Sequence, residues 1–188
     1  MGQLRPDTRP ATYDDVLDLP VHVVGEIIGG ELIVSPRPGP RHAIAATVLS
    51  GELGPPYHGG HGGPGGWWIL FEPELHLAGD ILVPDLAGWR RTRMPSVPAT
   101  TYFTLEPDWI CEVPSPSTAR LDRQHKLSAY ARESVRHAWL VDPVQRTLEV
   151  LRREGHQWVI VSVHAEDDEV CAEPFEATSL SLARLWVD

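Results

Sequence analysis

The sequence contains little cysteine and no long apolar run. Cys111 and Cys171 are the two cysteines of the 188-residue chain, and neither has a partner at metal-ligand spacing. This excludes a zinc ribbon and a disulfide scaffold. No stretch approaches the roughly 20 apolar residues of a membrane helix, and residues 1–10 lack the apolar core of a signal peptide. The sequence therefore predicts a cytoplasmic protein without a membrane partner.

Common catalytic motifs are also missing. There is no G-x-S-x-G elbow, no P-loop, no H-E-x-x-H and no G-x-G-x-x-G that opens a helix after a strand. Asp and Glu total 26 against 16 Lys and Arg, a formal net charge of −10. This balance argues against a general nucleic-acid coat but leaves room for a local basic site.

The length and composition are those of one ordinary globular domain. Hydrophobic residues make up 42% and charged residues 22%, close to the average of folded proteins. We expect a single domain over residues 1–188, with its core over about residues 12–163. Helical and strand patterns are mixed along the chain, which predicts a mixed α+β (α/β) fold with one principal sheet flanked by helices.

The periodicity of apolar residues places these elements along the chain. Helices are expected over residues 12–19, 41–53 and 119–133, and strands over 67–77, 81–89, 108–113 and a meander within 138–163. Gly29-Gly30 predicts a two-residue hairpin turn within residues 23–34. Residues 54–66, rich in glycine and proline, are expected to be a mobile loop, and the acidic residues 166–176 are expected to be solvated.

Two carboxylates fall inside apolar strands, where an ionised group is costly unless it is paired or coordinated. Asp85 lies in the run Ile81–Leu86, and Glu112 lies in the run Trp109–Val113. If the two strands are neighbours, the acids converge at the strand ends. Two carboxylates with open positions suit Mg²⁺, which keeps waters and takes a phosphate oxygen as a further ligand.

Lys126 is the single lysine beside 15 arginines. It follows Glu112 by 14 residues, so a turn and a returning helix could bring its ammonium to the acids. Acids, lysine and metal together suit phosphoryl chemistry. From spacing alone a structural interpretation is equally open: Asp85 caps a turn, Glu112 pairs with an arginine and Lys126 lies at the surface.

These residues resemble a known family. The motifs are Pro84-Asp85, then Glu112-Val113 followed by Ser115-Pro116-Ser117-Thr118, then Asp122, Lys126 and Tyr130, and finally Trp139-Leu140-Val141-Asp142-Pro143. Upstream, Glu26 to Leu32, Ser35 to Pro38 and Arg41-His42 fit the same pattern. Over roughly residues 12–163 the chain resembles the Uma-type putative restriction endonuclease family, within the PD-(D/E)XK nuclease superfamily.

The resemblance implies a restriction-endonuclease-like fold, with Asp85 and Glu112 as ligands of Mg²⁺ or Mn²⁺. The superfamily signature has its lysine two residues after the acid, where this chain has Pro114. Lys126 must then complete the site. Glu31 is a candidate third acid and His42 a candidate auxiliary residue, although a hairpin carboxylate and a polar residue at a helix N-terminus are also ordinary structural features.

The leading hypothesis is a metal-dependent endonuclease that hydrolyses phosphodiester bonds in DNA. The alternative is a nuclease fold with weak catalysis that acts as a nucleic-acid-binding or regulatory partner, which the net charge and Pro114 motivate. A third interpretation is a homodimeric interaction protein, because several of the seven tryptophans could lie at an interface.

Overall fold

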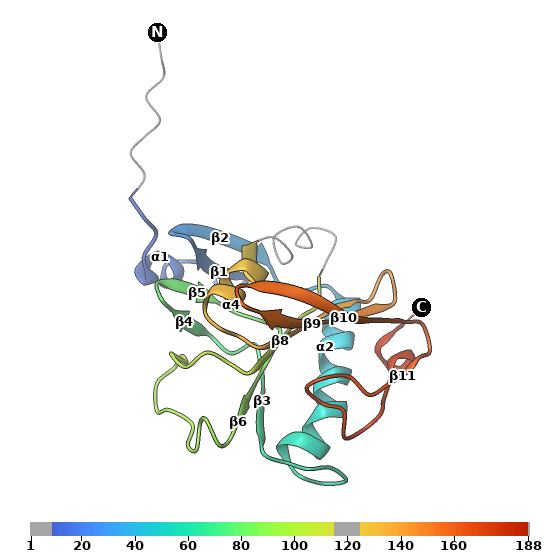
Figure 1. Cartoon of the computed structure of the whole chain (residues 1–188). Helices are drawn as coiled ribbons and strands as arrows, with labels where there is room; N and C mark the ends of the chain where they lie inside the picture. Colours follow the sequence, from blue (N-terminus) through green and yellow to red (C-terminus); the bar gives the residue numbers. More distant parts are fainter. Residues whose placement is uncertain (1–8, 115–124, 188) are drawn as a thin grey trace.

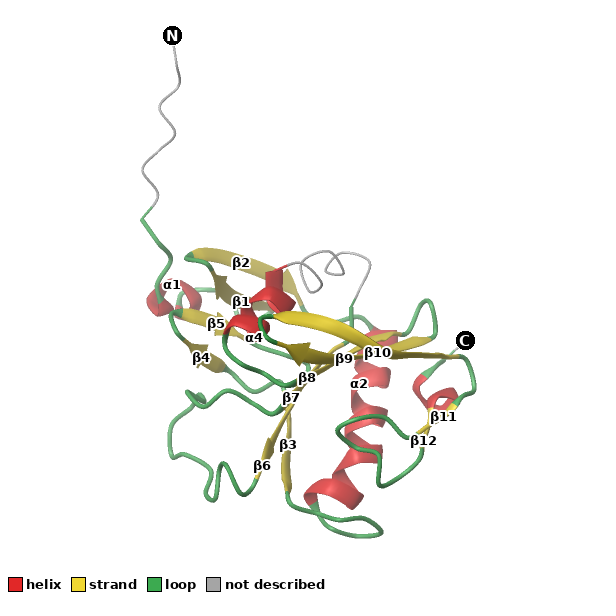
Figure 2. Cartoon of the chain, viewed as in Figure 1, coloured by secondary structure: helices red, strands yellow, loops and turns green. Residues whose placement is uncertain are grey.

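The computed structural model describes residues 9–114 and 125–187. Its elements in chain order are α1 (Tyr13–Leu17), β1 (Val23–Ile28), β2 (Glu31–Pro36), α2 (Pro40–Leu53), the π-helical turn η1 (Gly54–His58), β3 (Trp67–Phe71), β4 (Leu75–Leu77), β5 (Asp80–Leu82), β6 (Leu86–Arg90), β7 (Trp109–Glu112), α4 (Leu127–Arg132), β8 (His137–Asp142), β9 (Thr147–Glu154), β10 (Gln157–Ala165), β11 (Glu169–Val170), β12 (Leu180–Ser181) and η3 (Leu182–Leu185). Strands predominate, and α2 is the longest helix of the described residues (Figure 1, Figure 2).

The strands form two main sheets. The larger is six-stranded, in the order β10-β9-β8-β7-β6-β3, and the smaller is four-stranded, in the order β2-β1-β5-β4. In the larger sheet β7 and β8 are parallel, while the other neighbours are antiparallel. The fold is therefore mixed α+β, as the sequence predicts.

The second main sheet is a difference from the expected single one. The predicted strands 67–77 and 81–89 do pair, but each is interrupted. Their inner halves form β4–β5 in the smaller sheet, and their outer halves form β3–β6 in the larger. The break at Val83–Asp85 contains Pro84, which has no N–H to continue a ladder. Asp85 therefore lies where one sheet ends and the other begins.

The N-terminal elements agree with the sequence. Asp15 accepts the Thr12 backbone N–H at 2.7 Å and closes the predicted capping box of α1. Gly29 and Gly30 have φ of +61° and +82°, the left-handed conformation that a two-residue hairpin turn requires. The helix predicted over 41–53 is α2, which begins one residue earlier with proline in its first turn.

Two segments that the sequence predicts to be a mobile loop or solvated contribute side chains to the core. Within residues 54–66 the turn η1 buries Tyr57, whose hydroxyl donates to the backbone carbonyl of Phe175. Phe175 itself, inside the acidic stretch 166–176, is 2% exposed and packs against Trp67 and Trp109. Aromatic burial outweighs the polar and flexible composition of both segments, since one aromatic side chain buries a large apolar area.

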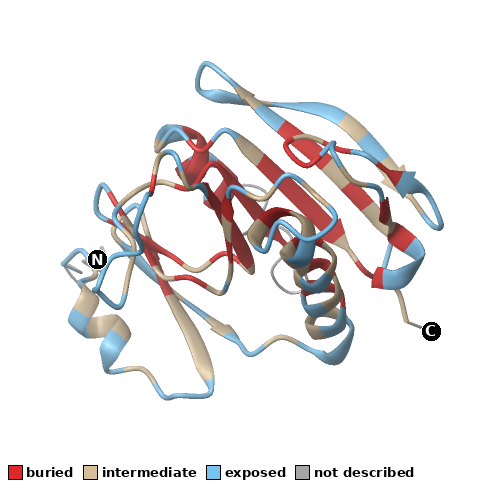
Figure 3. Ribbon diagram, turned by 90° about the horizontal axis from the view of Figure 1, so that it is seen from below, coloured by how far each residue is buried: buried red, intermediate tan, exposed pale blue. Residues whose placement is uncertain are grey.

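The six-stranded sheet has a core on each face. Alternate residues of β7 and β8 point to opposite faces: Trp109 and Trp139 pack with α2, while Ile110 and Leu140 pack with α4. Buried residues concentrate along the strands, and the connecting loops are mostly exposed (Figure 3). This alternation directs Glu112, two residues after Ile110, towards α4.

Of the helix predicted over 119–133, α4 is the described part. Residues 115–124, which include the Ser115 to Thr118 motif and Asp122, lie outside the described residues. In the part of the chain that the structure covers, no helix is long and apolar enough to cross a membrane.

Candidate active site

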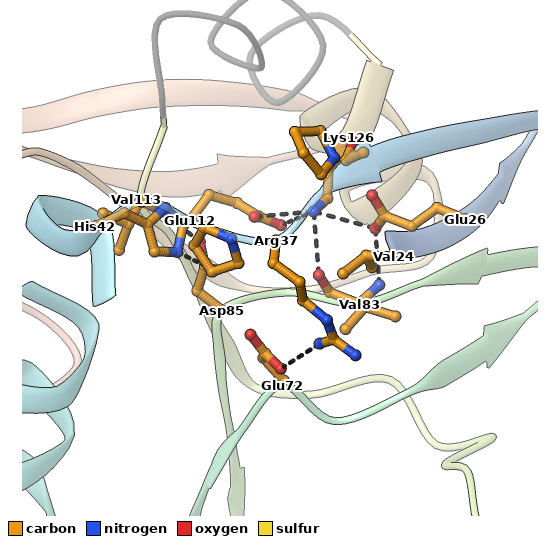
Figure 4. A pocket seen from close by; sticks show the side chains of 14 residues that line it. Val24, Glu26, Arg37, His42, Glu72, Val83, Asp85, Glu112, Val113 and Lys126 are labelled. Atoms are coloured by element: carbon orange, nitrogen blue, oxygen red, sulfur yellow. Dashed lines mark hydrogen bonds and ion pairs between the residues drawn. The ribbon is translucent and has the colours of Figure 1, made fainter. Parts of the chain in front are cut away.

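A pocket of about 280 Å³ lies between the β1–β2 hairpin, the start of α2, the start of β6 and the end of β7. Among the described residues its lining includes seven ionisable side chains, namely Glu26, Arg37, His42, Glu72, Asp85, Glu112 and Lys126 (Figure 4). Four of the five residues predicted for the site thus share one cavity. The pocket is where the two main sheets meet.

Strand register brings the two predicted acids together. In the antiparallel β6–β7 pair, Leu86 lies opposite Cys111. Continuing that register by one residue places Asp85 opposite Glu112, and opposite residues of an antiparallel pair point to the same face. The backbone N–H of Val113 donates to Asp85 Oδ2 at 2.6 Å and fixes the carboxylate at the strand end.

Lys126 reaches Glu112 from the beginning of α4. Its Nζ lies 2.9 Å from each carboxylate oxygen of Glu112 and donates to the carbonyl of Val83 at 3.2 Å. Glu112 is 2% exposed and Lys126 3%. The alternative from spacing, with Lys126 at the surface, is wrong for that residue, and among the described residues Glu112 pairs with Lys126. Pro114 does not prevent this arrangement, because the lysine comes from a different element.

Two residues of this cluster were missed as site residues from the sequence. Glu26 on β1 lies with its Oε1 3.1 Å from Lys126 Nζ and accepts the Val83 N–H at 2.8 Å. Tyr130 donates its hydroxyl to Glu112 Oε1 at 2.7 Å. Glu26 could have been found from the sequence, because it is a carboxylate within the apolar run 23–28. Asp85 and Glu112 were chosen by this same criterion. For Tyr130 the available signal was its place in the motif of the family resemblance, since by pattern it occupies an apolar position of its helix.

His42 lies on the other side of Asp85, in the first turn of α2. Its Nε2 is 2.6 Å from Asp85 Oδ1, and both side chains are 13% exposed. Asp85 is therefore held between a histidine and a backbone N–H. The predicted auxiliary residue is at the site, in contact with the predicted acid.

Glu31 is not at this site. It is exposed directly after the Gly29-Gly30 turn, and it lines a separate shallow pocket with Arg9 and Asp15. The expectation that Glu31 supplies a third acid to the site is wrong, and the direction of β1 explains why. β1 runs from the pocket to the turn, so Glu26 near its middle lies at the pocket and Glu31 at the distal end.

The pocket is rich in carboxylates, the ligand type that Mg²⁺ prefers in proteins. Within the described parts of the chain, four carboxylates line it against two permanent cations, Arg37 and Lys126, a formal excess of two negative charges. Among the described residues no group of three or more His, Cys, Asp or Glu side chains is arranged to hold a metal ion by itself. That is the usual situation for Mg²⁺, which is held by one or two carboxylates and completes its shell with water and substrate oxygens.

Cys111 lies beneath the two acids on the opposite face of β7. Complete burial raises the pKa of its thiol well above the ordinary value, and the negative charges of Asp85 and Glu112 raise it further. The thiol is therefore neutral near pH 7. Thiolate chemistry at this site is thereby disfavoured, and the reactive groups are oxygen and nitrogen.

The family comparison agrees with this geometry. A family model described as "Uma2: Putative restriction endonuclease" matches residues 14–183. The chain belongs to the Uma2 family. The match extends further towards the C-terminus than the resemblance over residues 12–163. It takes in β11, β12 and the start of η3; η3 packs on α2, and Val170 and Leu180 of the two strands belong to the same core.

Solved structures show the same architecture. A crystal structure from Anabaena variabilis ATCC 29413, described as "a putative nuclease belonging to DUF820", superposes with a TM-score of 0.75 and 23% identity. The alignment covers 94% of this chain and 97% of that one. The Uma2 chain thus has the restriction-endonuclease-like fold. No curated protein matches it significantly. Family and fold together support a nuclease.

Proposed function

We propose that this Uma2 protein is a divalent-metal-dependent endonuclease that hydrolyses phosphodiester bonds in DNA. One observation carries the proposal: Asp85, Glu112 and Lys126, from three separate elements, line a single pocket. Metal-assisted phosphoryl transfer uses carboxylates that bind a metal cation. It also uses a positive charge that stabilises the negative charge on the phosphate oxygens. Two neighbouring carboxylates and a buried ammonium can supply both.

Asp85 and Glu112 are the residues that would hold Mg²⁺ or Mn²⁺. Each carboxylate oxygen has two lone-pair directions, and the contacts of Asp85 with His42 and Val113 use one direction on each of its oxygens. When bound, the metal would act as a Lewis acid towards the phosphate and lower the pKa of a water.

Lys126 acts as a hydrogen-bond donor and a positive charge rather than as a base. Glu26, Glu112 and the Val83 carbonyl supply acceptors for the three hydrogens of an ammonium. A neutral amine would leave one of these acceptors without its donor, at a cost in a buried position. Lys126 therefore stabilises the negative charge that builds on the phosphate oxygens as water adds to phosphorus and the ester P–O bond breaks.

The remaining residues hold these groups in place. His42 and the Val113 N–H orient Asp85, while Tyr130 orients Glu112. Glu26 balances the Lys126 charge before substrate arrives. The same contacts favour a catalytic protein over a nuclease fold that only binds, since a purely structural scaffold gains little from a buried lysine shared by two carboxylates.

The test is relaxation of supercoiled plasmid DNA by the purified full-length chain, with Mg²⁺ or Mn²⁺ and with EDTA. We expect nicking with metal only, slowed at least about 100-fold in Asp85→Asn. The asparagine keeps an oxygen that can accept the Val113 N–H, so Asp85→Asn should fold. The melting temperature of this variant is the control for folding. Asp18→Asn, an exposed change at the end of α1, should cut like wild type. Plasmid left intact by wild-type protein with either metal would overturn the proposal.

A further inference from the structure

The outer end of the pocket carries an ion pair that has no role in the proposed hydrolysis of the phosphodiester bond. Arg37, directly after β2, lies with Nη1 3.6 Å from Glu72 Oε2 (Figure 4). The Arg37 side chain is 54% exposed and that of Glu72 25%, whereas the side chains of Lys126 and Glu112 alone are 4% and 3% exposed. Arg37 and Glu72 therefore lie at the solvent side of the cavity, with the catalytic cluster behind them.

Glu72 is held in this place by the backbone of Asp85. Its backbone N–H donates to the Asp85 carbonyl at 3.0 Å, and its φ is +43°. A non-glycine residue seldom adopts this left-handed conformation, and such conformations gather at functional sites. The backbone thus fixes a carboxylate at the opening of a pocket that is already negatively charged.

Arg37 is the cation that an incoming phosphate meets first. Among the described residues lining the pocket, Arg37 and Lys126 are the permanent cations, and Lys126 is buried beneath carboxylates. Besides Glu72, Arg37 contacts the Val21 carbonyl through Nη2 at 3.2 Å. A guanidinium has five N–H donors in a planar fork, so these contacts leave donors for a bidentate phosphate contact.

We propose that Arg37 binds a backbone phosphate of the DNA at the opening of the pocket, and that Glu72 holds Arg37 over the opening until the phosphate replaces it. The inference rests on the proposed nuclease function and identifies the residue that recognises substrate. It also gives Glu72 an opposing role, because its carboxylate competes with the phosphate for the same guanidinium.

The experiment measures binding of a fluorescent DNA duplex by anisotropy over a salt series, with Ca²⁺ in place of Mg²⁺. Arg37→Ala should weaken binding roughly tenfold, as expected for loss of a charged hydrogen bond. It should also reduce the slope of log K against log salt by about 0.9, the value for one phosphate contact. Arg37→Lys keeps the charge without the fork, and it should restore the slope but only part of the affinity.

Glu72→Gln should have the opposite effect and tighten binding about two- to fivefold, the range of an exposed ion pair. In the Arg37→Ala background, Glu72→Gln should give a smaller gain, because the competition for the guanidinium has been removed. Arg184 and Glu52 form a matched ion pair outside the pocket. Arg184→Ala and Glu52→Gln remove the same charges and should leave the salt slope unchanged.

The outcomes separate this inference from the proposed function. If wild-type protein and Arg37→Ala bind DNA with the same affinity and salt slope, the inference about Arg37 is overturned, but the proposed nuclease function is not. Weaker binding by Glu72→Gln would overturn the competition. A wild-type protein without measurable affinity for DNA overturns the proposed function as well.

Discussion

Lys126 Nζ lies 2.9 Å from both carboxylate oxygens of Glu112, although 14 residues separate the two in sequence. Within a strand the residue two positions after Glu112 would share its face, but that position is Pro114. The ammonium comes instead from the start of α4, which packs on the face of the sheet where Glu112 points. A different element thus supplies the lysine beside the acid.

Divalent metal should stabilise the folded protein through Asp85 and Glu112. Because a ligand that binds only the folded state stabilises it by mass action, Mg²⁺ at about 100 times its Kd should raise the melting temperature by roughly 5 to 10 °C. Thermal unfolding with Mg²⁺ and with EDTA measures the shift. Asp85→Asn should lose most of it, and an equal shift in wild type and variant would show that the metal binds elsewhere.

Tyr130→Phe should destabilise the protein through Glu112. The hydroxyl donates to a buried carboxylate at 2.7 Å, and removing such a donor costs about 1–3 kcal/mol. Urea unfolding measures the free-energy change. Tyr102→Phe is the control, since that ring stacks on His76 at a partly exposed position. Equal stability of Tyr130→Phe and wild type would contradict the hydrogen bond.

Stability should fall as the pH drops below about 6.5, in part through His137. Burial lowers the pKa of His137 below its ordinary value, although Glu173 opposes the shift. The unfolded chain then takes up a proton at a higher pH than the folded chain, so the free energy of unfolding decreases as pH falls. Urea unfolding between pH 7.5 and 5 should show a shallower decrease in His137→Gln. Identical pH profiles would refute this contribution.

Local chemistry accounts for the parts of the fold that the sequence predicted. The Gly29-Gly30 turn needs two positive φ angles, and the capping box of α1 needs an acceptor at Asp15. The division into two sheets was not predicted, because Pro84 signals a break without specifying where each half of the strand will pair. Burial of Tyr57 on Phe175 joins residues 118 apart, which a local pattern cannot show.

The site was predictable to the extent that charge conflicts with an apolar strand. Asp85 and Glu112 stood out for that reason, and Lys126 stood out as the single lysine. Glu26 meets the same criterion, yet Glu31 on the same hairpin was selected. Distinguishing the two requires the direction of β1 relative to the pocket, which is a property of the assembled sheet.

The central claim is that Lys126 and Glu112 form one catalytic site, and plasmid nicking by Lys126→Ala tests it most directly. The change removes the ammonium that pairs with the buried Glu26 and Glu112 and should cost about 3–5 kcal/mol of stability, so the rate is compared at a temperature where both proteins are folded. Arg136→Ala, an exposed change just before β8, is the control. We predict that Lys126→Ala nicks at least about 100-fold more slowly than wild type while Arg136→Ala is unaffected. Nicking by folded Lys126→Ala at the wild-type rate would contradict the account.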